Sequence, residues 1–314
     1  MWNVEFVLEC KRAFHIPHSK FLIAAAAVIS LACPAGAQST GAELRAKFEH
    51  RLQEIAERVD GVVGYEILDL VSGDRFAHLE RESFPTASTI KLAIVYELVK
   101  EVDEGRIRLD ETLTLDRSKA VGGTGVLVHL GTPTLSIRDY ATLMVTLSDN
   151  TATNVLIDRL GLDAIAKRMQ ALGLAGTKLR RRMMDTAAAR RGDENVSTPA
   201  ELVRLLQAMN GAHGGSGEGA FAMRLAIELL KKPKESRLRR GLPGGVAAAD
   251  KPGELDGVRV DAGIVYAAKR PYIFAVMTTF LKDEGEGERA IEAMSRLSYE
   301  YFSRAANPLG RRIE

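Results

Sequence analysis

Three short motifs contain the residue types that serine acyl transfer requires. Ser88 precedes Lys91 by three positions, Ser148 lies two positions before Asn150, and Lys251 comes further along the chain. A serine hydroxyl is a weak nucleophile near neutral pH, so an enzyme must supply it with a base, a proton relay and donors for an oxyanion. Because these motifs can supply all three, they predict a serine hydrolase.

The first two motifs also have ordinary structural interpretations. Ser88 can cap a helix on which Lys91 reaches solvent, and Ser148-Asp149-Asn150 can form a turn and the N-cap of a following helix. A helix that starts at Ser88, however, brings Lys91 onto nearly the same face. An apolar, crowded site there would lower the pKa of the lysine amine and let it act as a base.

The third motif is the weakest when taken alone. Lys251-Pro252-Gly253 follows a short apolar run, so the pattern places it at the end of a strand. Lys251 could bind a substrate carboxylate there, and Gly253 would let the backbone approach closely. The three motifs in this order are far more specific than any one of them.

Periodicity predicts strands at both ends of the folded part and helices between them. Helical patterns cover residues 44–59, 88–102, 137–147, 152–160, 162–172, 199–209, 220–230 and 289–303. Strand patterns cover residues 62–70, 75–79, 246–249, 259–267 and 272–281. The expected fold is α/β of the α+β type, in which both chain ends build one antiparallel five-stranded sheet against a mostly helical lobe. The glycine-rich stretch 211–219 is interpreted as a surface loop of this single domain.

Residues 1–37 have the pattern of an export signal, and residues 38–314 are assigned to the hydrolase domain. Basic residues precede the apolar run 21–31, and small residues allow cleavage before Gln38. The run is too short to span a membrane comfortably, so we expect no stable membrane span and a periplasmic or secreted protein. The alternative is a lipoprotein that carries its lipid on Cys33.

Composition excludes several other classes of function. The chain has 314 residues, is 46% hydrophobic and has a net charge of +2, which argues against nucleic acid as a partner. Both cysteines lie in the expected leader, so the mature chain would have no disulfide or thiol nucleophile. No histidine spacing typical of a metal site is present. We therefore expect no metal and no cofactor, and the sequence does not fix the oligomeric state.

At this point the chain resembles the class A β-lactamases and the related penicillin-binding proteins, a likeness that covers nearly all of the mature chain. Gly192-Asp193-Glu194-Asn195, running into Thr198-Pro199, is similar to the end of that family's active-site Ω loop. The resemblance implies these roles: Ser88 as acylated nucleophile, Lys91 as its base, Ser148 as proton shuttle, Asn150 as a hydrogen-bonding group for the substrate, Lys251 as carboxylate anchor, and the N–H groups of Ser88 and Glu254 as oxyanion donors.

The chain departs from the family pattern at two places. Pro252 stands where the family has a hydroxyl residue that binds the substrate carboxylate, and Arg259 is the expected replacement. In register with the family's Ω loop, Met183 stands at the position of the glutamate that activates the deacylating water, and Ala187 at that of the amide residue beside it. The loop keeps one carboxylate near these positions, Asp185, so we expect it to act as substitute base.

The alternative for Asp185 is an ion pair with Arg181 or Arg182. The same register pairs Arg181 with Asp193 at the neck of the loop.

Three functions stay open at this level: a β-lactamase with fast or slow deacylation; a peptidase or esterase acting on cell-wall peptides or small esters; and a β-lactam or peptidoglycan binding module that acylates and stalls. The sequence does not define the β-lactam spectrum or the physiological substrate.

Overall fold

Five antiparallel strands drawn from both ends of the chain form the main sheet of the described part. The computed structural model describes residues 35–213 and 220–307. The strand order is β2-β1-β9-β8-β7. The strands are β1 Val62–Asp69, β2 Arg75–His78, β7 Ala248–Leu255, β8 Val258–Val265 and β9 Tyr272–Thr279. The predicted five-stranded sheet is therefore confirmed.

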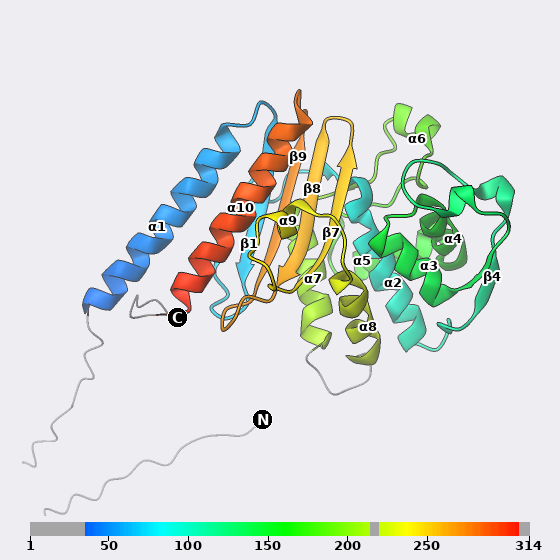
Figure 1. The fold of residues 1–314 in the computed structure, drawn as a ribbon, viewed down its shortest axis with the longest axis horizontal. Helices are drawn as coiled ribbons and strands as arrows, with labels where there is room; N and C mark the ends of the chain where they lie inside the picture. Colours follow the sequence, from blue (N-terminus) through cyan, green and yellow to red (C-terminus); the bar gives the residue numbers. More distant parts are fainter. Residues whose placement is uncertain (1–34, 214–219, 308–314) are drawn as a thin grey trace, which may run out of the picture. The chain divides into compact units, whose positions relative to one another are not determined.

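Helices pack against both faces of this sheet (Figure 1). On one face lie α1 Ala35–Glu57 and α10 Glu284–Ala305. On the other face lies the larger group, α2 Lys91–Asp103, α3 Ile137–Thr146, α4 Asn150–Leu160, α5 Leu162–Ala171, α7 Pro199–His213 and α8 Ala220–Lys231. Each side has its own apolar core, because residues from opposite faces of the strands belong to separate buried clusters. The group of helices on this second face corresponds to the predicted helical lobe.

Shorter elements connect these layers. Two-stranded ladders join β3 Phe84–Pro85 to β6 Val196–Ser197 and β4 Thr112–Thr114 to β5 Thr134–Ser136. Short helices are α6 Thr186–Arg190 and α9 Arg237–Arg240, and single 3₁₀ turns are η1 Ala87–Ile90, η2 Arg117–Lys119 and η3 Leu127–His129. Their patterns are too short to give a periodic signal in the sequence.

The last three strands are buried along most of their length. All eight residues of β9 are buried, because this strand lies in the middle of the sheet with helices on both sides. β7 continues to Leu255, so Lys251, Pro252 and Gly253 lie inside the strand and not at its end. β7 is an edge strand, and an edge position tolerates a proline because no neighbouring strand needs its missing N–H.

The expected leader lies almost wholly outside the described residues. The chain divides into two units after Ala35, and α1 begins at that residue. Cys33 and the apolar run before it are not described, so the division into a leader and a hydrolase domain stays a prediction. Across residues 35–213 and 220–307, no helix is both long and apolar enough to cross a membrane.

Candidate active site

Ser88 lies in a tight turn that leads directly into a buried helix. The 3₁₀ turn η1 contains Ser88, and α2 begins at Lys91. Ala87, just before the serine, has a φ of +48°, a left-handed conformation that non-glycine residues rarely adopt. Because of this turn, the Lys91 amine folds back and its Nζ donates to Ser88 Oγ at 3.2 Å.

The Lys91 side chain is fully buried among polar oxygens that carry no formal charge. Besides Ser88 Oγ, its Nζ donates to Ser148 O at 2.7 Å, Ser148 Oγ at 3.0 Å and Asn150 Oδ1 at 3.1 Å. An ammonium has three donors for these four acceptors, whereas a neutral amine has two donors and a lone pair. The lone pair can then accept the proton of the Ser88 hydroxyl.

The electrostatics favour the neutral amine. Burial lowers the pKa of Lys91 well below its ordinary value, and the nearby charge of Lys251 lowers it further, while Asp149 acts in the opposite direction. A lysine in such a site is deprotonated at a lower pH than in water. Lys91 therefore has the geometry and the pKa direction of a general base next to Ser88.

The Ser148 motif joins α3 to α4. Ser148 has a φ of +51°, and Asp149 is the N-cap of α4, where its Oδ1 accepts from Ala152 N at 2.8 Å. The other oxygen of Asp149 accepts from Val126 N at 2.6 Å and Leu127 N at 2.9 Å. The predicted turn and N-cap are present, and the same carboxylate fixes the adjacent loop.

Lys251 completes a chain of three groups. Its Nζ donates to Ser148 Oγ at 3.1 Å and to Pro252 O at 2.9 Å. Ser148 Oγ thus lies between the amines of Lys91 and Lys251, as a proton relay requires. Burial first, and the charge of Lys234 second, lower the pKa of Lys251 to about 8, against the opposing effect of Asp250.

A buried ionic network that the sequence analysis missed lies beside Lys251 in the chain. Asp250 is fully buried, and its Oδ1 accepts from Arg239 Nε at 2.7 Å and lies 3.7 Å from Lys234 Nζ. The fully buried Asp261 has a pKa raised to about 7, chiefly by burial and then by the charge of Asp250. The residues of this network do not form a recognisable motif, so the sequence alone does not predict their contacts.

Gly253 allows the edge strand to contact the nucleophile turn. A Cβ placed on Gly253 would lie 2.6 Å from Thr86 O and 2.7 Å from Thr89 Oγ1. Thr89 Oγ1 also donates to Lys251 O at 3.2 Å. A side chain at position 253 would therefore separate β7 from the Ser88 turn. The use of the Ser88 and Glu254 N–H groups as oxyanion donors stays a prediction.

The Ω loop, here residues 180–195, holds Met183 in a fixed place. Asn154 on α4 donates from Nδ2 to Met183 O at 3.1 Å and accepts from Met183 N at 2.9 Å. Asn154 lies one helical turn after Asn150, which contacts Lys91. The Met183 side chain is buried in the apolar core of the helical lobe. The resemblance assigns this position to a glutamate that activates water. Met183 stands there instead, and its thioether can neither donate nor accept a proton in catalysis.

Two expected ion pairs of this loop are wrong. Arg181 pairs with Glu194 at 2.9 Å and not with Asp193, and Asn195 Oδ1 accepts the Arg181 backbone N–H at 3.0 Å. Asp193 contacts Arg191 instead, at 3.4 Å.

Asp185 pairs with neither Arg181 nor Arg182. Its side chain is exposed and caps α6, where Oδ1 accepts from Ala188 N at 2.9 Å. Arg182 pairs with Asp158 at 2.6 Å. The structure brings together Ser88, Lys91, Ser148, Asn150 and Lys251 by direct hydrogen bonds, but records no such bond from Asp185 to any of them. Its role as a base stays a prediction.

Arginine side chains near the end of β7 are already engaged with acidic residues. Arg259 Nε pairs with Glu288 at 3.1 Å, and its guanidinium donates to two backbone carbonyls. The Glu254 side chain pairs with Arg237, a residue of α9 that the sequence analysis did not single out. Arg237 also pairs with Glu288 at 2.8 Å. Binding of a substrate carboxylate by Arg259 therefore competes with Glu288 and stays a prediction.

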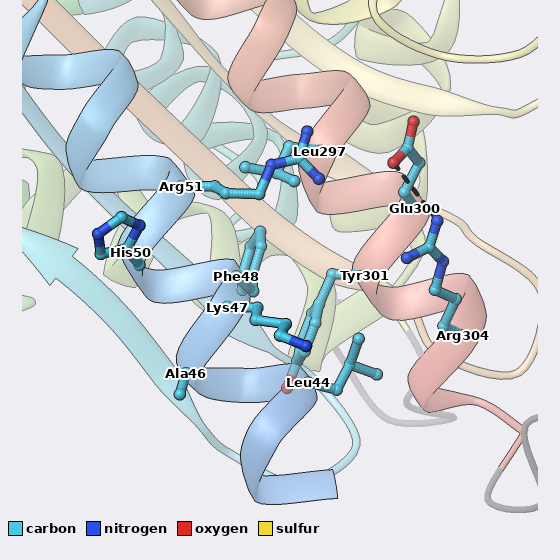
Figure 2. Close-up of a pocket in the computed structure, with 10 residues that line it drawn as sticks. All are labelled: Leu44, Ala46, Lys47, Phe48, His50, Arg51, Leu297, Glu300, Tyr301 and Arg304. Atoms are coloured by element: carbon cyan, nitrogen blue, oxygen red, sulfur yellow. Dashed lines mark ion pairs between the residues drawn. The ribbon is translucent and has the colours of Figure 1, made fainter. Parts of the chain in front are cut away.

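A separate groove lies between α1 and α10 (Figure 2). It has a volume of about 380 Å³, with apolar side chains such as Phe48 in its floor and the ion pair of Arg304 with Glu300 at its side. None of the residues that line it belongs to the three motifs, and none of them is a serine. The groove is thus not a site for serine chemistry.

The sheet order and the serine–lysine–serine cluster together define a class A β-lactamase-like protein. Residues 47–302 match the sequence model of the beta-lactamase enzyme family, and the chain belongs to that family. The resemblance inferred from the motifs is therefore confirmed, and the chain is a hydrolase of the β-lactamase type.

Individual relatives are distant but cover most of the chain. An imipenem-hydrolyzing β-lactamase of Enterobacter cloacae is 25% identical over 76% of this chain and 84% of its own length. β-Lactamase AST-1 of Nocardia asteroides is 27% identical over 87% and 90%. Among solved structures, a β-lactamase from Sphaerobacter thermophilus has a TM-score of 0.72, 29% identity and coverage of 80% and 95%. PBP-A has a TM-score of 0.74, 28% identity and coverage of 82% and 96%.

Proposed function

We propose that the protein is an exported serine hydrolase of the class A type that opens the β-lactam amide through an acyl-enzyme on Ser88. One observation carries the proposal: Ser148 Oγ lies 3.0 Å from Lys91 Nζ and 3.1 Å from Lys251 Nζ, while Lys91 Nζ also contacts Ser88 Oγ. Through these contacts a proton taken from the Ser88 hydroxyl can be replaced by one that Ser148 gives to the nitrogen of the scissile bond. Family membership supports the same reaction class.

These contacts support the following acylation step. Neutral Lys91 takes the proton of Ser88 as Oγ bonds to the β-lactam carbonyl carbon, and the C–N bond then breaks. The Ser148 hydroxyl gives its proton to the departing nitrogen and regains one from Lys91, so no net proton is lost. Lys251 attracts the substrate carboxylate, and Asn150 offers an amide donor. The Ser88 and Glu254 N–H groups stabilise the oxyanion in this proposal.

Deacylation is the slow step in our proposal. Hydrolysis of the acyl-enzyme needs a water from which a base removes a proton, and Met183 cannot serve as that base. Asp185 is the substitute that we propose for this segment, although its carboxylate caps α6 in the structure. A second candidate function follows from the same feature: a β-lactam binding protein that acylates and stalls. The likeness to PBP-A, of which an acyl-enzyme complex with penicillin G is known for one variant, supports that candidate.

Intact-protein mass spectrometry over time, after mixing with benzylpenicillin, tests the proposal. We expect an adduct of one penicillin on the wild-type chain and none on Ser88→Ala, together with consumption of many equivalents of substrate followed optically. An adduct that persists after one equivalent favours the stalling protein. No adduct and no substrate loss would reject the β-lactam reaction, and assay with D-Ala-D-Ala peptides and small esters would then test the peptidase or esterase alternative.

Export is part of the proposal and rests on the leader pattern of residues 1–37. We propose a periplasmic or secreted chain that starts at Gln38, with lipidation at Cys33 as the alternative. The mass of the chain isolated from the cell distinguishes these forms, since a lipidated N-terminus adds acyl groups. A full-length mass in an exporting bacterial host would contradict both.

Acylation by penicillins should fall at alkaline pH because of Lys251. Its pKa is about 8, so the ammonium that attracts the substrate carboxylate is present below that pH and disappears above it. Above the pKa, the protonated fraction of Lys251 falls about tenfold for each unit of pH. We expect the second-order acylation constant to decline above about pH 8 for benzylpenicillin, as measured by stopped-flow mixing. A p-nitrophenyl ester without a carboxylate is the control, and an equal decline for both would contradict the role of Lys251.

A further inference from the structure

The loop of residues 121–130, which we name the wall loop, is fixed beside the reactive groups. Asn150 N donates to Thr124 O at 3.0 Å, and Asn150 Nδ2 donates to Gly122 O at 3.1 Å. Asp149 accepts two further N–H groups from the loop. These bonds come from the same motif that contacts Lys91, so the loop forms a fixed edge of the site next to the Asn150 amide.

A side chain at position 123 of this wall would be strained and would displace the ends of Asn150 and Met184. Gly123 has a φ of +84°, and a Cβ placed on it would lie 2.6 Å from Asn150 Nδ2 and 3.0 Å from Met184 Sδ. Real Cβ atoms do not approach other atoms as closely as the first distance. The wall loop therefore presents only backbone here, and the thioether that lies against it comes from the Ω loop.

Met184 differs from the other methionines that the structure describes. The residue is 45% exposed, whereas the remaining described methionines are buried. Its φ of +64° is left-handed, and its neighbour Met183 is fixed by Asn154 with its side chain in the core. Two adjacent methionines thus separate, one into the core and one toward Gly123. A flexible, polarizable side chain exposed at this place can contact a ligand.

We propose that Met184 is a specificity-determining residue that contacts the acyl side chain of the substrate and favours flat aromatic groups; this inference rests on the proposed function. The Asn150 amide nitrogen has two donors, and Gly122 O accepts one of them. The other has no acceptor among the described residues and can bind the amide carbonyl that joins a penicillin nucleus to its acyl group. An acyl group bound there emerges beside Gly123 and Met184 Sδ, where a sulfur–aromatic contact is favourable.

Paired substrates test this inference. Benzylpenicillin carries an aromatic acyl group, whereas 6-aminopenicillanic acid has the same bicyclic nucleus without it. The ratio of their second-order acylation constants should fall about threefold to tenfold in Met184→Ala, which corresponds to the usual strength of a sulfur–aromatic contact. Alanine retains the Cβ, so the backbone strain at this position is unchanged. Val71→Ala removes an exposed apolar side chain from the turn after β1, away from the three motifs, and should leave the ratio unchanged.

The outcomes separate the inference from the proposed function. An unchanged ratio in a Met184→Ala protein that still acylates would overturn the specificity role alone. An equal loss with both substrates would also overturn it, because that result indicates a structural effect, which thermal unfolding would show. If the wild-type chain is acylated by neither compound, the proposed function fails and the inference falls with it. A lower ratio in Met184→Ala with Val71→Ala at the wild-type ratio supports the assignment.

Discussion

The variant Lys91→Met is expected to lower the second-order acylation constant for benzylpenicillin about a hundredfold to ten-thousandfold, the usual contribution of a general base. Methionine has nearly the length of lysine but no nitrogen, so it removes the contacts with Ser88 Oγ and Ser148 Oγ together. Stopped-flow mixing and mass spectrometry of the adduct measure the change. Lys100→Met, on the same helix but paired with Asp103, is the matched control and should acylate normally.

The stability of Lys91→Met distinguishes loss of a base from loss of structure. The folded-state pKa of Lys91 lies below that of the unfolded chain, so at any pH below the unfolded value folding must either release a proton or bury a charge. Methionine avoids that cost, although the oxygen atoms around it lose a donor. We expect a melting temperature close to that of the wild type near pH 7. A variant that unfolds early, or one that acylates within tenfold of the wild type, would contradict the assignment of Lys91 as the base.

The helices and the sheet could be predicted because their signals are local. Helix α3 was expected over residues 137–147 and is Ile137–Thr146, and β1 was expected over residues 62–70 and is Val62–Asp69. β7 was predicted too short because Lys251-Pro252-Gly253 has the composition of a turn. Only the strand order shows that this segment lies at an open edge, where proline fits.

Contacts between reactive groups could be predicted within a motif but not between motifs. Ser88 and Lys91 share one turn, so their spacing alone indicates that they meet. Their contacts with Ser148 and Lys251 depend on how distant segments pack, and the family resemblance was needed to expect them. The predicted partner of Arg181 was wrong by one residue, because a loop has no hydrophobic periodicity from which the pairing of its side chains could be predicted. The contact of Met184 with Gly123 had no sequence signal.

The second large effect is expected from Met183→Glu, which should raise the deacylation rate at least about a hundredfold if the missing base limits turnover. Asn154 binds both the N–H and the carbonyl of residue 183, so a glutamate would begin from a fixed backbone. Burial in an apolar core raises the pKa of a carboxyl group, which brings it closer to the operating pH of a general base. Burial of the acid should also lower the free energy of unfolding, by about 1 to 3 kcal/mol.

Decay of the penicillin adduct, followed by mass spectrometry after excess substrate is removed, measures this rate directly. Met183→Gln is the matched control, because it has the same shape as glutamate and the same polar burial but no basic oxygen. A gain for glutamate and none for glutamine shows that the absent carboxylate limits the wild type. Equal rates in all three proteins would mean that a base already acts on the water. In that case Asp185→Asn in the wild-type background should slow the decay, because Asp185 is the carboxylate of the Ω loop with an exposed side chain closest in sequence to Met183.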